Sequence, residues 1–115
     1  KDLIHLALFD EWILKNFESI GRNRELLSCV NTFFVQEKFA KENLRGIMAV
    51  VGTGSFTSTR ISAVAANTFG FVLNIPLLAI DAEQISKAQQ LIPRLLEQKI
   101  GLYISAIYSA PPNIG

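Results

Sequence analysis

Apolar and polar positions in the first third of the chain follow an extended pattern and then a helical one. Residues Leu3–Phe9 and Trp12–Glu18 predict two strands, which the polar pair Asp10-Glu11 joins as a hairpin. The first of these strands is apolar on both faces, which is typical of a central, covered strand. Asn23 is a good helix cap, and apolar residues at helical spacing predict a helix over approximately Arg24–Lys41.

The middle of the chain has the pattern of a βαβ unit. Ile47–Val51 predicts a buried parallel strand, a glycine turn follows, and Thr57–Leu73 predicts a helix that leads into a second buried strand, Ile75–Ile80. The crossover between two such strands is right-handed. Small side chains recur every four positions along this helix, at Ser58, Ser62, Ala66 and Gly70. They allow either the first helix or a partner to pack unusually close.

The last part of the chain predicts a third helix and a short final strand. Asp81 and Gln84 have the spacing of a capping box before a helix over approximately Ala82–Gln98, which Pro93 kinks or divides, and Leu102–Tyr108 predicts a strand. The residues of this helix expected to face inward are Ile85, Ala88, Ile92, Leu95 and Leu96. We therefore expect residues 1–115 to form one α/β domain with a mixed sheet, in which an N-terminal antiparallel hairpin accompanies the βαβ unit.

The composition indicates a folded domain whose surface needs a covering partner. Half of its 115 residues are hydrophobic and the mean hydropathy is +0.30, which is high for so small a domain. A partner protein or a second copy is expected to cover the excess. The net charge is +1 and no run of Lys or Arg occurs, so direct binding of nucleic acid is not expected. The single cysteine, Cys29, is expected to be a small buried residue of a cytoplasmic protein.

A membrane span is not expected, although residues 61–80 carry no charge. Asn67, Asn74 and Pro76 interrupt this stretch and favour a helix followed by a strand. No signal peptide is visible. The chain starts at Lys1 without a methionine, which leaves open whether N-terminal sequence is missing.

The turn after the first buried strand carries the candidate chemistry. Its glycines allow close backbone approach, and N–H groups at a helix start can bind an anion. The candidate anion-site residues are Gly52, Gly54, Ser55, Thr57 and Arg60. A structural corner explains the same residues. A Walker A loop is excluded because no lysine precedes the Ser or Thr, whereas a dinucleotide turn with Asp81 as the ribose ligand stays open. His5 is the only histidine and has no second ligand nearby, so no metal site is expected.

Three segments resemble the TsaB (YeaZ) family. The first is Gly52-Thr53-Gly54-Ser55-Phe56-Thr57-Ser58-Thr59-Arg60, which keeps the family's two glycines, its Ser-Phe-Thr core and its arginine, and departs at Thr53, Ser58 and Thr59. The second is Leu73-Asn74-Ile75-Pro76-Leu77, and the third is the tail Tyr108–Ile114 with its Tyr, Pro, Asn and Ile residues.

The resemblance implies half of an actin-like, Hsp70-like (ASKHA, ribonuclease H-like) fold and a non-catalytic role. A TsaB subunit is a scaffold that pairs through its first two helices with a catalytic TsaD-type subunit or with itself. Together with a TsaE-type ATPase, that complex forms N6-threonylcarbamoyladenosine in tRNA. By position, the interface falls on Asn23–Phe34 and Thr57–Gly70. The expected interface residues are Leu26, Cys29, Val30, Phe33, Ser58, Ser62, Ala66 and Gly70.

Two departures from the family pattern indicate a shortened member. The family's first strand, which ends in an Ile-Asp-Thr-Ser phosphate loop, has no counterpart here, so we expect no bound ATP and no other cofactor. Most of the family's second subdomain is also missing, since Ala82–Gln98 leads almost directly to the tail. The alternative function is an enzyme or nucleotide-binding module that uses the Gly52–Gly54 turn and Asp81.

Overall fold

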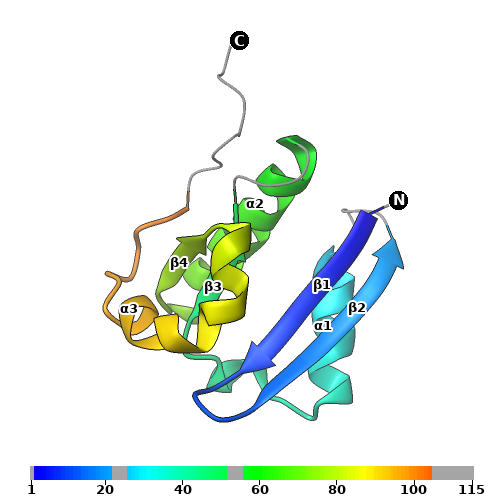
Figure 1. Cartoon of the computed structure of the whole chain (residues 1–115), viewed down its shortest axis with the longest axis horizontal. Coiled ribbons are helices and arrows are strands. Elements are labelled where there is room, and N and C mark those ends of the chain that lie inside the picture. Colours follow the sequence, from blue (N-terminus) through cyan, green and yellow to red (C-terminus); the bar gives the residue numbers. More distant parts are fainter. Residues whose placement is uncertain (1, 22–25, 52–55, 105–115) are drawn as a thin grey trace.

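The computed structural model describes residues 2–21, 26–51 and 56–104, with the side chains at 2–4, 19–21 and 56–60 outside the description (Figure 1). The strands are β1 (Asp2–Phe9), β2 (Leu14–Gly21), β3 (Ile47–Val50) and β4 (Leu77–Ile80). The α-helices are α1 (Leu26–Gln36), α2 (Phe56–Leu73) and α3 (Ile92–Leu96), and two 3₁₀ helices occupy Lys41–Asn43 and Ala82–Leu91. None of the helices in the described part of the chain has the length and apolar character needed to cross a membrane.

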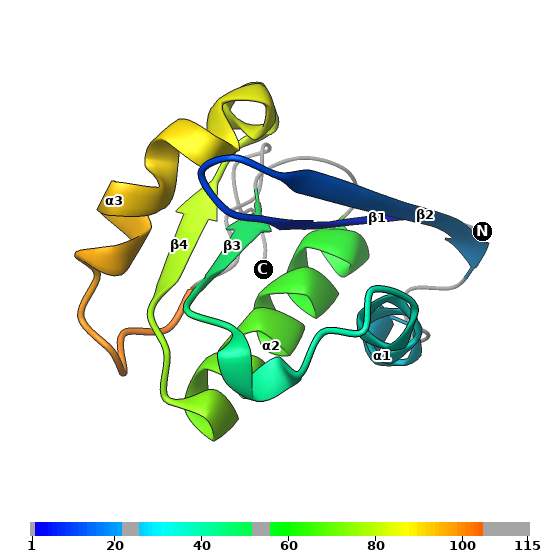
Figure 2. The same ribbon diagram turned by 90° about the horizontal axis from the view of Figure 1, so that it is seen from below.

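The helices lie on both sides of the strands. In Figures 1 and 2, α1 lies behind the hairpin and α2 behind the parallel pair, while the 3₁₀ helix Ala82–Leu91 and α3 lie on the opposite side. Contacts join α1 to β1, α2 to β3, and α3 to β4. The central apolar cluster consists of Leu78, Ile80 and Leu95, with Met48, Val50 and Leu91 packed against it. This cluster therefore lies between the parallel strands and the segment Ala82–Leu96.

The hairpin forms as predicted, but its second strand starts at Leu14 rather than at Trp12. The Asp10 carboxylate Oδ1 accepts hydrogen bonds of 2.8 Å from the backbone N–H groups of Trp12 and Ile13. The Asp10 N–H donates in turn to the Ile13 carbonyl at 3.0 Å. These bonds place Trp12 and Ile13 in the turn. The hydrogen bonds from the N–H groups of Ile13 and Trp12 also lower the pKa of the Asp10 carboxyl group.

The prediction that the first strand is central and covered was wrong for the described residues. Here β1 pairs with β2 alone, antiparallel, and β3 pairs with β4 alone, parallel, so the hairpin and the βαβ unit form two separate sheets. His5 and Ala7 are exposed while Leu6 and Leu8 are half-buried, which is the alternation of a strand covered on one face. The His5 ring also lies 3.0 Å from the Asn16 side-chain oxygen, on the exposed face of the hairpin.

The βαβ unit is confirmed, and its close packing has a cause inside the chain. Ala66 and Gly70 on α2 are buried, and a Cβ added at Gly70 would lie 2.9 Å from the side chain of Leu77 on β4. Glycine at position 70 therefore lets the chain's own β4 pack onto α2. The expectation that this residue faces another helix or a partner is corrected, and Ala66 is buried within the chain.

The third predicted helix is divided into the 3₁₀ helix Ala82–Leu91 and the short α3, with Pro93 near the start of α3. The division fits the prediction at Pro93, but the first part is not α-helical. Of the residues expected inward, Ala88 and Leu95 are buried, whereas Ile85 and Leu96 are exposed.

Replacing Asp81 with alanine is expected to lower the free energy of unfolding by about 0.5–2 kcal/mol. The Asp81 carboxylate accepts from the Gln84 N–H at 3.0 Å, and the Gln84 side-chain oxygen accepts from the Asp81 N–H at 2.9 Å. Alanine removes the carboxylate that accepts from the Gln84 N–H, whereas the backbone N–H of residue 81 can still donate to the Gln84 side chain. Urea unfolding measures the change, and Asp81→Asn, which can still cap, should retain most of the stability; equal losses in both variants would contradict the capping account.

Candidate partner-binding site

The candidate anion site lies almost entirely outside the described residues. Gly52, Gly54 and Ser55 fall in the turn that is not described. Thr57 and Arg60 lie in the first turn of α2, and their side chains are not described. The anion site, and the nucleotide-binding alternative with it, therefore stays a prediction.

Asp81, the predicted ribose ligand of the alternative, has a structural role in the described fold. It follows β4, and its carboxylate caps the next 3₁₀ helix through the bond from Gln84 N–H. The capping box explains an acid at this position without a ligand.

The predicted interface residues lie mainly on the inward sides of the first two helices. Phe33 is 2% exposed and its ring stacks on Phe17 of β2 at a centroid distance of 5.4 Å. Ala66 and Gly70 are also buried, and Gly70 lies against Leu77 of β4. Leu26, Cys29, Val30 and Ser62 are half-buried, and Ser58 lies outside the described side chains. Because Phe33, Ala66 and Gly70 are buried within the chain, they do not lie on its outer surface.

The opposite sides of the same two helices expose large apolar residues. We define the outer helix face by its exposed residues Leu27, Asn31 and Val35 on α1 and Val64, Phe71 and Val72 on α2. The exposed fractions of Val35 and Phe71 are 70% and 72%. On both helices these residues follow helical spacing, so each helix carries large apolar side chains, beside uncharged polar ones, on its outward side.

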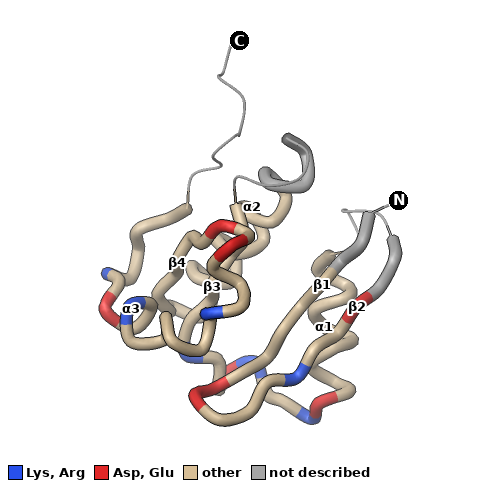
Figure 3. Tube along the Cα trace, viewed as in Figure 1, with Lys and Arg blue, Asp and Glu red and all other residues tan. Residues whose placement is uncertain are grey.

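The outer helix face carries no charge. The segment Leu26–Gln36 has no Asp, Glu, Lys or Arg, and Arg60 is the only charged residue of Phe56–Leu73. In Figure 3 the described lengths of both helices are accordingly tan, while charged residues appear on the loops, the hairpin and the α3 side. Contacts join α1 and α2, so the two uncharged faces belong to neighbouring helices. Exposed apolar residues without charge are typical of a protein-binding surface.

The missing charge is the sequence signal that identifies this face. Our prediction assigned the apolar positions of each helix to one side, which is the side that the chain's own core uses. Arg60 is the only charged residue of the two helices, whereas surface helices usually carry charged residues on their outward side. Which residues of these helices contact a partner stays a prediction.

The end of α1 forms a hollow beside the outer helix face. The Phe39 N–H donates to the Phe34 carbonyl at 2.9 Å and the Lys38 N–H to the Val35 carbonyl at 3.1 Å, which is a Schellman motif. The rings of Phe34 and Phe39 meet edge to face at 5.4 Å, as the motif's apolar contact. This motif ends α1 at Gln36, five residues before the predicted end.

Lys38 takes the position in this motif that glycine or asparagine usually occupies. Its φ is 54°, in the left-handed region. The end of α2 has the same arrangement, with Asn74 at φ 57° and the Ile75 N–H bonded to the Gly70 carbonyl at 3.2 Å. Asparagine tolerates this conformation and lysine does not, so the two helix ends differ in strain.

Replacing Lys38 with glycine is expected to raise the free energy of unfolding by up to about 1 kcal/mol. The left-handed conformation costs a non-glycine residue about 1–2 kcal/mol, and the extra unfolded-state freedom of glycine offsets about 0.5–1 kcal/mol of this gain. Asn74→Gly is the matched control and should change stability by less. A destabilised Lys38→Gly variant in urea unfolding would show that the lysine side chain stabilises the fold.

Comparison with known proteins identifies the fold. No protein-family model matches the chain, and no curated protein matches it. The solved structure of YeaZ from Pseudomonas aeruginosa superposes with a TM-score of 0.61 and 24% sequence identity, over 67% of this chain and 38% of YeaZ. A second solved structure is that of an uncharacterized protein with similarity to peptidase YEAZ from Pseudomonas aeruginosa. It superposes with a TM-score of 0.64 and 22% sequence identity, over 77% of this chain and 44% of that one.

These two likenesses confirm the predicted α/β fold class and show that the chain has the fold of YeaZ. The chain spans less than half the length of either solved structure.

Proposed function

We propose that this chain, which has the fold of YeaZ, is a TsaB-type scaffold subunit of the cytoplasmic complex that forms N6-threonylcarbamoyladenosine in tRNA. It pairs with a TsaD-type catalytic subunit, which in turn works with a TsaE-type ATPase. The observation that carries this proposal is the outer helix face, because it lies on the two helices through which the family resemblance implies pairing.

The chemistry of the outer helix face suits a permanent protein contact. Burying one large apolar side chain contributes about 1.5–3 kcal/mol. The outer helix face offers five such residues: Leu27, Val35, Val64, Phe71 and Val72. Together they can offset an association cost of about 4–15 kcal/mol. No charge has to be removed from water when this face is covered, which favours association further.

Among the described residues, His5 and Asp81 could act in catalysis, and both form hydrogen bonds within the chain. His5 contacts Asn16 on the exposed hairpin, and Asp81 caps a helix. Cys29 is half-buried in α1. A scaffold requires no acid, base or nucleophile, so these roles are compatible with the proposal.

Isothermal titration calorimetry with the TsaD-type protein of the same genome tests the proposal. We expect one-to-one binding with a dissociation constant of about 1 μM or tighter. Absence of any heat and of co-elution would contradict the scaffold function. Calorimetry with ATP and with NAD tests the alternative. A nucleotide-binding module should bind one of them tightly, and the Gly54→Val variant should no longer bind that nucleotide.

A further inference from the structure

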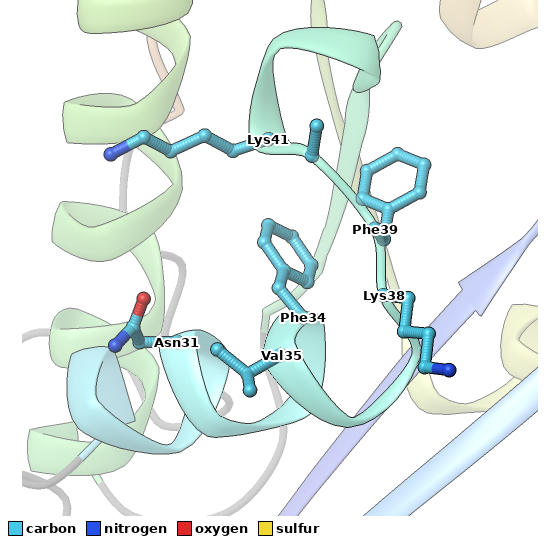
Figure 4. A pocket seen from close by; sticks show the side chains of 7 residues that line it. Asn31, Phe34, Val35, Lys38, Phe39 and Lys41 are labelled. Atoms are coloured by element: carbon cyan, nitrogen blue, oxygen red, sulfur yellow. The ribbon is translucent and has the colours of Figure 1, made fainter.

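The hollow at the end of α1 combines an apolar lining with two cations. Its volume is about 360 Å³. Asn31, Phe34 and Val35 of α1 line it together with Lys38, Phe39 and Lys41 of the following segment. In Figure 4 the Lys41 side chain extends toward α2, and Lys38 points to the opposite side. The two ammonium groups therefore flank the apolar lining from two directions.

Both cations are available to a binding partner. Lys38 and Lys41 are exposed. Neither forms an ion pair with a carboxylate in the part of the chain that the structure describes, although Glu37 and Glu42 are their neighbours in sequence. A partner that brings carboxylates to this place meets two positive charges without displacing an internal partner.

The left-handed backbone of Lys38, with φ 54°, belongs to the Schellman motif that ends α1. Here it places an ammonium group at the rim of the hollow.

We propose that this hollow binds a short acidic segment of a partner protein. An apolar side chain of the segment enters the hollow beside Phe34, and flanking carboxylates meet Lys38 and Lys41. The volume is at the lower end of the range for ligand pockets, which suits one anchoring side chain rather than a whole domain. Asn31 and Val35 also belong to the outer helix face, so a protein seated there can reach the hollow. The site does not depend on a TsaD-type partner and goes beyond the scaffold function.

A peptide fits the hollow better than a nucleic acid. Two lysines on opposite sides do not form the continuous basic path that a phosphate backbone follows. The contact between Phe34 and Phe39 is edge to face, so one ring already covers part of the other's stacking surface.

Nuclear magnetic resonance of the full, nitrogen-15-labelled chain tests the proposal. The probe is the acetylated, amidated peptide Glu-Asp-Leu-Asp-Glu at low salt. We expect saturable shifts of the amide signals of Phe34 and Lys38–Lys41, with a dissociation constant of about 0.1–1 mM. Raising the salt from about 0.05 M to about 0.5 M should weaken binding at least about threefold.

The controls separate this site from general attraction to lysines. The double variant Lys38→Gln, Lys41→Gln should bind at least about fivefold more weakly. The variant Lys87→Gln, Lys99→Gln removes two exposed lysines elsewhere and should bind as the natural chain does. A peptide with Gly in place of Leu should also lose the shifts at Phe34. Equal binding by both double variants, shifts without saturation, or tighter binding of hexauridylate at the same amides would each overturn the proposal.

Discussion

Replacing Phe33 with alanine is expected to lower the free energy of unfolding by about 3–5 kcal/mol. The Phe33 side chain is 2% exposed and stacks on Phe17 of β2 with an interplanar angle of 30°. It also lies 6.4 Å from the Phe34 ring, measured between centroids. A two-stranded hairpin is not stable alone in water, so removing this ring should also detach the hairpin from α1. Urea unfolding followed by circular dichroism gives the free energy, and amide exchange gives the local effect.

Two further substitutions on α1 act as controls for this effect. Phe33→Leu keeps most of the buried volume and should cost less than about 1.5 kcal/mol. Val35→Ala changes a residue that is 70% exposed and should stay within about 0.5 kcal/mol. If Phe33→Ala costs no more than Val35→Ala, the packing of α1 on the hairpin is wrong.

Replacing Phe71 with glutamate is expected to weaken binding of a TsaD-type subunit at least about 100-fold, or about 2.7 kcal/mol. The Phe71 side chain is 72% exposed on α2, so the free chain tolerates the change. In the complex, the new carboxylate would be buried in an apolar contact without a partner. Calorimetry measures the affinity, and urea unfolding should show a change within about 0.5 kcal/mol.

Trp12→Glu is the matched control, because Trp12 is 85% exposed at the hairpin turn, away from the outer helix face. It should leave the affinity unchanged. If Trp12→Glu abolishes binding and Phe71→Glu does not, the partner binds the hairpin turn and the outer helix face is wrongly assigned.

Most of the elements could be predicted because their signals are local. The βαβ unit follows from two apolar strands separated by a helical pattern, and Asp81 with Gln84 marks a capping box. Errors occurred at element ends that are set by local hydrogen bonds. The Asp10 carboxylate accepts from two N–H groups, so β2 begins two residues later than predicted. A Schellman motif at Lys38 ends α1 earlier than predicted. Neither event changes the hydrophobic pattern, so periodicity does not detect it.

The apolar faces of the two helices could be predicted, but not which of them belongs to the core. Apolar periodicity places Phe33 on the apolar face of α1 and Ala66 on that of α2. It does not say whether these faces meet the core or a partner. The structure places both in the core. The position of β1 is also non-local: its apolar residues suggest a central strand, yet in the described residues it pairs with β2 alone. Which strand lies next to which depends on contacts that one segment's pattern does not contain.

Size exclusion with light scattering tests the scaffold function most directly. The chain is measured alone and mixed with the TsaD-type protein of its own genome. The account predicts a one-to-one complex with the summed mass of the two proteins, and loss of that complex in Phe71→Glu. A mixture that elutes as two separate species, or a homodimer of this chain that ignores the TsaD-type protein, would contradict it.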